Sequence, residues 1–237
     1  MAYRKSAPRA EFHKAIADVV ERVRSAGRQG VPLPLKEYVY ACSVFLAHAE
    51  FENYFVDVLD RVARLYSTQS TSNSVVPVSL RTHVFLSRSN VWRPIANWLA
   101  DGNEQSLLKG AAVALSNHVP AFLGTTSPPP PLTSVDISGS LTYPSVTNLT
   151  QVLRRIGIGD PKGAINQAAG TDAWSLLQSI ASLRTALAHD ASMPGVSEHD
   201  LIARLRGLEK FVAAMDRALY AHVRETHKVK AWTAAMP

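Results

Sequence analysis

The chain has 237 residues, of which 46% are hydrophobic and 19% charged, with a formal net charge of +6 and a pI near 9.6. This composition is too apolar for a disordered chain, and a chain of this length can bury a core without a disulfide or a structural metal. Cys42 is the only cysteine, which excludes an intramolecular disulfide and a thiolate zinc cluster. No run reaches the ~18 apolar residues of a membrane span, so we expect a cytoplasmic protein with no membrane partner.

Helical periodicity dominates the first third of the chain. Apolar residues at steps of three and four predict a helix over about 8–25, followed by a stop signal at 27–30, and a long helix over about 35–66. A polar Ser/Thr run at 67–74 predicts a loop. The apolar stripe of the long helix consists of Tyr40, Val44, Ala47, Phe51, Phe55, Val58, Val62 and Leu65.

The middle of the chain is less regular and is interpreted as an insertion over about 75–144. Shorter helical pieces are expected near 77–87, 92–100 and 104–116, with a break at Pro120. The run at 127–131 contains four prolines, which favour polyproline II. It is typical of a stiff connector and, less often, of a ligand for a proline-recognition module. From there to 144 we expect a surface excursion.

The second half returns to helices. A short helix is predicted over about 146–156, a second from an N-cap at 171–172 through about His189, and a final one after a Ser197/Asp200 pair that resembles a capping box. Amphipathic helices of this kind need one another to cover their apolar stripes. The sequence therefore predicts one all-α domain over 1–237, a four-helix bundle with the insertion between its second and third core helices.

Familiar catalytic motifs are absent from the sequence. It contains no phosphate-cradling Gly-rich loop, no H-E-x-x-H and no nucleophile elbow, and its histidines are scattered, so we expect no metal and no cofactor. An arginine followed by a histidine five positions later occurs twice, at Arg184/His189 and at Arg217/His222, where chance gives about 0.6 such pairs.

The two pairs differ in context. Arg217 and His222 sit inside a continuous predicted helix, where residues five apart diverge by about 140°. Arg184 and His189 are at a predicted helix end, where fraying would let the imidazole turn toward the guanidinium. By position alone, Arg184 is equally interpreted as a solvated charge, and His189 as a cap on the last carbonyls.

The neighbouring sequence carries a family resemblance. The string Ala181 to Asp190, "ASLRTALAHD", resembles the end of the motif helix in the HEPN superfamily, and the 47–59 stretch "AHAEFENYFVDVL" is similar to the second core helix of its RiboL-PSP-HEPN-like branch. The "LRRIGI" and "VS-x-x-DL" segments before and after the motif also look like that branch. The resemblance covers about 35–68 and 145–225. It departs at Thr185, where an asparagine is common.

The resemblance implies a metal-independent endoribonuclease whose active site is shared by two protomers. In that mechanism the ribose 2′-hydroxyl attacks the adjacent phosphorus and leaves a 2′,3′-cyclic phosphate. His189 would act as general base or acid and Arg184 would stabilise the phosphate charge. Thr185 and Asp190 would orient these groups, and Glu52 would hold Arg184. Arg154, Arg155 and Lys162 are candidates to bind the RNA backbone, although a solvated face explains them equally.

Three functions stay open at this point. The first is a ribonuclease of toxin–antitoxin or antiphage defence type acting on tRNA, mRNA or other structured RNA, with an antitoxin or regulatory protein as a further partner. The second is a HEPN-fold RNA-binding or scaffold protein without catalysis. The third is an unrelated helical interaction protein. The basic charge favours nucleic acid as partner but is also met in solvated surfaces without one.

Overall fold

The computed structural model describes residues 3–69, 72–89, 92–102, 104–122, 124, 128–141, 144–190, 195–227, 232 and 236, and no strand occurs among them. The described helices are α1 (Ala7–Gly27), α2 (Leu33–Gln69), the 3₁₀ turn η1 (Asn73–Val75), α3 (Val78–Ser89), α4 (Trp92–Asp101), α5 (Glu104–Phe122), α6 (Ser134–Ser138), α7 (Val146–Arg155), α8 (Pro161–Ala169), α9 (Ala173–Asp190) and α10 (Glu198–His227). The expected all-α helix bundle is confirmed. None of these helices has both the length and the apolar character that crossing a bilayer requires.

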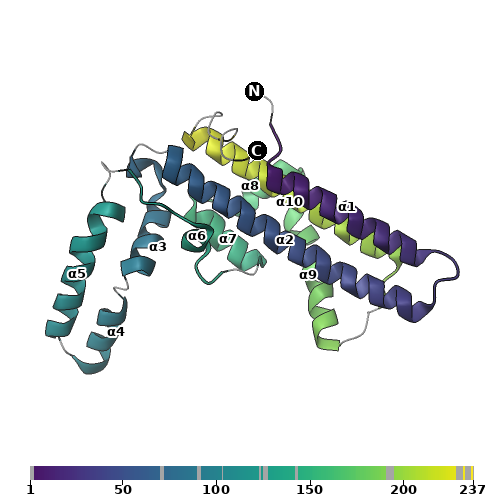
Figure 1. Cartoon of the computed structure of the whole chain (residues 1–237), viewed down its shortest axis with the longest axis horizontal. Helices are drawn as coiled ribbons and strands as arrows, with labels where there is room; N and C mark the ends of the chain where they lie inside the picture. Colours follow the sequence, from purple (N-terminus) through teal and green to yellow (C-terminus); the bar gives the residue numbers. More distant parts are fainter. Residues whose placement is uncertain are drawn as a thin grey trace.

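Four helices form the bundle. Helices α1, α2 and α10 run side by side along the long axis of the molecule, and α9 packs against both α10 and α2 (Figure 1). The stripes predicted from the sequence are buried in it. Phe51 of α2 is at the centre, with its ring against those of Phe12, Tyr54 and Phe211, and Phe211 in turn meets Trp174 edge to face. These five rings come from α1, α2, α9 and α10, so one aromatic cluster joins the whole bundle.

The two ends of the chain meet at α10. Asp216 is fully buried in α10, and its carboxylate accepts hydrogen bonds from the hydroxyl of Tyr3 and from the hydroxyl and backbone amide of Ser6. The Ser6 hydroxyl also accepts from the amide of Arg9 and so caps α1. Near the other end, the Trp232 indole donates to the carbonyl of Arg4 at 2.9 Å. The segment before α1 is therefore held by contacts with Asp216 of α10 and with Trp232.

Helix α2 is longer than its apolar stripe predicts, and it ends at Gln69. Part of the Ser/Thr run that predicts a loop is helical, and within it Ser67 and Thr68 donate their hydroxyls to the carbonyls four residues earlier. Helix α5 likewise extends to Phe122, so the expected break at Pro120 is wrong. Pro120 lies in the last turn, where a proline removes one backbone hydrogen bond without ending the helix.

Residues 128–141 pack against the bundle, so the expected surface excursion is wrong for this segment; Ser127 lies outside the described residues. The amide of Leu132 donates to the Ser67 hydroxyl and the amide of Ser134 donates to Asp60, both at 2.9 Å. Helix α6 then places Ile137 in the core, completely buried against neighbours that include α2 and α3. The prolines cannot donate backbone hydrogen bonds, and the residues after them supply the contacts instead.

Helices α3, α4 and α5 form the other end of the molecule. Helix α3 packs on α6 and α7, α5 packs on α3 and α4, and Figure 1 shows α4 and α5 side by side beyond the end of α2. Arg88 of α3 anchors this end, because its guanidinium makes two bonds, of 2.8 and 2.7 Å, to the carboxylate of Asp136.

Replacing Phe51 with alanine should lower the free energy of unfolding by about 3–5 kcal/mol, because it removes a fully buried ring that packs against rings of α1, α2 and α10. Urea denaturation followed by circular dichroism measures this. Leu33→Ala, at a position that is 66% exposed on the same helix, should change the value by less than about 0.5 kcal/mol. Similar losses for the two variants would contradict the central role of the ring.

Candidate functional site

Helix α9 brings Arg184 against α2. The apolar stripe of α9, Leu177, Ile180, Leu183 and Leu187, is buried, and Arg184, which comes directly after Leu183, is half-buried. This is the position in which an arginine can hold an anion while its stem stays packed.

His48 of α2 lies close to Arg184, and Glu52 lies close to His48. His48 is 4% exposed, and its Nδ1 is 3.5 Å from Oε1 of Glu52, one helical turn further on. Burial lowers the pKa of His48, the positive charge of Arg184 lowers it further, and Glu52 raises it in part. We call Arg184, His48 and Glu52 the α2–α9 cluster.

His48 was missed as a site residue by the sequence analysis. It precedes Glu52 by four residues, which places both on one face of α2, and this spacing was available as a signal. The sequence does not say which of the many half-buried faces meets α9. That contact depends on the packing of two helices that are more than 100 residues apart along the chain.

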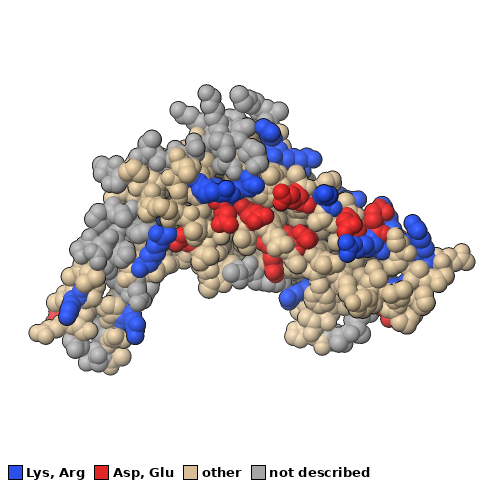
Figure 2. Space-filling view, in the orientation of Figure 1, with Lys and Arg blue, Asp and Glu red and all other residues tan. Residues whose placement is uncertain are grey.

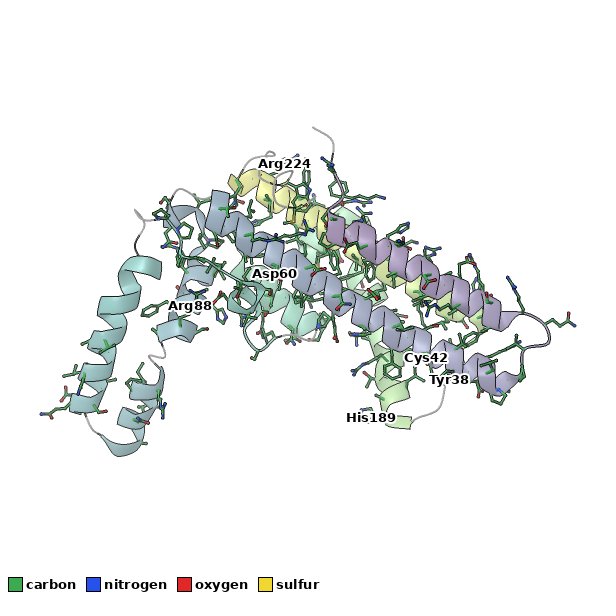
Figure 3. The ribbon with its side chains drawn as sticks, viewed as in Figure 1. Tyr38, Cys42, Asp60, Arg88, His189 and Arg224 are labelled. Carbon is green, nitrogen blue, oxygen red and sulfur yellow. The ribbon has the colours of Figure 1, made fainter. Side chains whose placement is uncertain are left out.

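His189 lies on a different side of α9 from Arg184. The helix continues to Asp190, so the expected fraying at His189 does not occur, and the two residues are about 140° apart around the axis. His189 is exposed near the free end of α9, below the part of α2 that carries Tyr38 and Cys42 (Figure 3). Within one chain, Arg184 and His189 therefore lie on two separate surfaces of α9.

The supporting residues are distributed over both surfaces. Thr185 is exposed and is only about 40° around the helix from His189, and its hydroxyl donates to the carbonyl of Ala181 at 3.0 Å. Asp190 is the last residue of α9, and its side chain lies outside the described part of the structure. The Thr185 hydroxyl is thus engaged by its own helix in this state.

The three candidate RNA-binding cations have different roles. Arg155 donates to the carbonyls of Ile137 and Ser138 at 2.9 and 2.6 Å, so it satisfies the end of α6 and is part of the fold. Arg154 and Lys162 are exposed, on α7 and α8. The structure therefore leaves those two, and not Arg155, as free to approach a ligand.

The second Arg/His pair lies in a groove between α8 and α10. Arg217 and His222 both line it, together with Asp160, Arg224 and Glu225, and its volume is about 520 Å³. Arg217 donates to the carbonyl of Ala168 at 3.0 Å and so holds the end of α8. Burial lowers the pKa of His222, while a hydrogen bond with the Ile156 carbonyl raises it in part. Both side chains are already engaged in packing α8 and α7 on α10.

Metal-binding clusters are not found in the described residues: no three His, Cys, Asp or Glu side chains among them are grouped to hold an ion.

A comparison with models of protein families gave no match for the chain, and searches of curated proteins and of solved structures also gave none.

Stability should fall as the pH is lowered through the ordinary histidine pKa of 6.5. Burial lowers the pKa of His48, and of the histidines at 83, 222 and 227, so the folded chain binds fewer protons there than the unfolded chain. Buried Asp216 acts in the opposite direction, because its pKa is raised, but only in a range that begins near 3.8.

The test is urea unfolding at about pH 7.5 and about pH 5.5. His48→Phe keeps the ring volume and should reduce the loss of stability between the two values. His199→Phe, at a side chain that is 94% exposed, should leave that loss unchanged. An unaltered pH dependence in His48→Phe would show that the His48 pKa is not lowered.

Proposed function

We propose that this chain is a metal-independent endoribonuclease that uses Arg184 and His189 from each of two copies. The observation that carries the proposal is the position of Arg184, half-buried and close to His48, with Glu52 beside that histidine and an exposed imidazole further along the same helix. The guanidinium carries five N–H donors, which can bind the oxygens of a phosphate. The HEPN resemblance assigns the same residues to catalysis.

In the proposed reaction, one His189 in its neutral form removes the proton of the ribose 2′-hydroxyl. The 2′-oxygen then bonds to phosphorus as the bond to the 5′-oxygen breaks, and a second, protonated His189 donates its proton to that leaving oxygen. The products are a 2′,3′-cyclic phosphate and a free 5′-hydroxyl. Arg184 stabilises the charge on the phosphoryl oxygens in the transition state. Two imidazoles in opposite protonation states therefore require two copies of the motif.

An apolar stripe on α2 supports the pairing of two copies. Leu35, Tyr38, Phe45, Leu46 and Val56 are each at least 40% exposed, and helical geometry places them within a sector of about 100° that flanks Glu52. An isologous dimer through this α2 stripe would bury these side chains and bring the α9 ends of both copies toward one cleft. In such a dimer Arg184 and His189 of one chain would face different copies, which accounts for their positions on different sides of α9.

The cellular role that goes with this activity is that of a toxin or antiphage defence effector, which an antitoxin or regulatory protein would hold in check. A scaffold or RNA-binding protein without catalysis is the second candidate. It is favoured by one observation, the engagement of the Thr185 hydroxyl within its own helix, since Thr185 replaces the common asparagine.

Purified protein should cleave RNA in the presence of EDTA, and His189→Ala and Arg184→Ala should each slow cleavage by at least about 100-fold. Unchanged circular dichroism spectra would show that both variants fold. The matched control is His222→Ala, which removes a histidine five residues after an arginine on another helix and should retain most activity.

Three outcomes overturn the assignment. Equal cleavage by His189→Ala and the wild type removes the catalytic role of His189. Loss of activity in folded His222→Ala moves the site to the α8–α10 groove. No cleavage of total bacterial RNA by the wild type leaves the non-catalytic candidate.

The α2 stripe should hold a dimer at about 10 µM, a concentration at which stable homodimers form. Phe45→Glu should give a monomer in sedimentation velocity and should lose cleavage with it, because a charge would be buried in the interface. Leu33→Glu, on the same helix but outside the stripe, should remain a dimer. A monomeric, active wild type would refute the composite site.

A further inference from the structure

A second groove, between α1 and α10, gathers positive charge. Its volume is about 330 Å³. Five Lys and Arg side chains line it, namely Lys5, Arg9, Arg206, Lys210 and Arg217, together with His13. Glu209 is the one acidic residue among its described lining residues.

The cations form two facing rows. On α10, Arg206, Lys210 and Arg217 are separated by four and seven residues, which places them on one side of the helix over about 16 Å. Across the groove, Lys5 and Arg9 are also four residues apart. The buried Asp216 network described above fixes the segment that carries Lys5, so this row is held in place by the fold.

Most of this charge is uncompensated. Glu209 pairs with Arg206 at 2.6 Å and also contacts His13. Lys5 and Lys210 are exposed and have no hydrogen-bond or ion-pair partner within the described part of the chain. Arg9 contacts the Tyr3 hydroxyl, and Arg217 uses one nitrogen for the end of α8, so both retain N–H groups for a ligand.

The exposed side of α1 contrasts with this groove. There Arg22 pairs with Asp18 at 2.6 Å and Arg24 with Glu21 at 2.5 Å. Figure 2 shows Lys and Arg interspersed with Asp and Glu over the α1–α2 face. On that face the cations lie among acidic side chains, whereas Glu209 is the one acidic residue among the described residues that line the groove.

We infer that the α1–α10 groove binds the sugar-phosphate backbone of a nucleic-acid strand. A strand presents a negative charge at every nucleotide, which matches rows of cations better than a single anion does. The lining contacts expected for a strand are charge contacts to its phosphates, which do not depend on base sequence. Among the lining residues Phe12 and Val212 are buried, so they offer an acidic protein no exposed apolar anchor of the kind that protein interfaces use.

This inference does not rest on the proposed catalysis. The groove residues are separate from the α2–α9 cluster, and binding is measured with a chain in which His189 is replaced by alanine, so that the probe is not cut. A failure of cleavage with intact binding, or the reverse, therefore separates the two proposals.

The test uses fluorescence anisotropy with a labelled single-stranded RNA of about 20 nucleotides and mixed sequence. In the His189→Ala chain, adding Lys5→Glu and Lys210→Glu should weaken binding at least about tenfold at low salt and reduce the slope of log affinity against log salt by about 1.4 or more. The matched control adds Lys14→Glu and Lys109→Glu, which change the net charge equally on exposed positions outside the groove, and should weaken binding by no more than about twofold.

Equal losses for the groove variant and the control would show that net charge alone drives binding, and an unchanged affinity in the groove variant would remove the site. A labelled polyglutamate peptide of similar length should bind the unaltered groove at least about tenfold more weakly than the RNA. Equal binding of the two would overturn the assignment to nucleic acid in favour of an acidic protein.

Discussion

The burial of one face of α2 is the constraint around which the rest of the molecule is arranged. The helix has 37 residues and is about 55 Å long, so no single neighbour can cover it. At one end α1, α9 and α10 bury its stripe around Phe51. Toward the other end α6 covers it, held by the bonds of the preceding residues to Asp60 and Ser67. Both candidate sites depend on helices that are placed by this contact.

The polar groups left inside this packing decide what faces solvent. Asp216 costs free energy to bury, and the donors that satisfy it, Tyr3 and Ser6, tie the start of the chain to α10. The same attachment sets Lys5 and Arg9 opposite the cations of α10. On the other side of the bundle, the burial of His48 places its ring next to Arg184 and Glu52. At Asp216 and at His48, the packing that buries a polar side chain therefore also positions residues of a proposed site.

The two proposals assign different work to different surfaces. The α2–α9 cluster and the α2 stripe concern bond cleavage between two copies, whereas the α1–α10 groove concerns the hold on a strand. A nuclease that acts on long RNA gains from this division, because backbone contacts distant from the scissile bond add affinity without fixing which bond is cut. The groove gathers five of the cations that make the chain basic, and two of them, Lys5 and Arg9, lie near the start of the chain.

Local periodicity determined the positions of α1, α2, α7, α9 and α10 and their buried stripes, because burial imposes steps of three and four on the sequence itself. It missed α8, although Asp160 caps that helix, Pro161 begins it and Gly170 ends it in a left-handed conformation, all signals present in the sequence. Whether Arg184 meets His48, where His189 points, and which cations share a groove were decided only by tertiary structure. These contacts join residues more than 100 positions apart, and a pattern within one helix specifies its apolar face but not the partner that covers it.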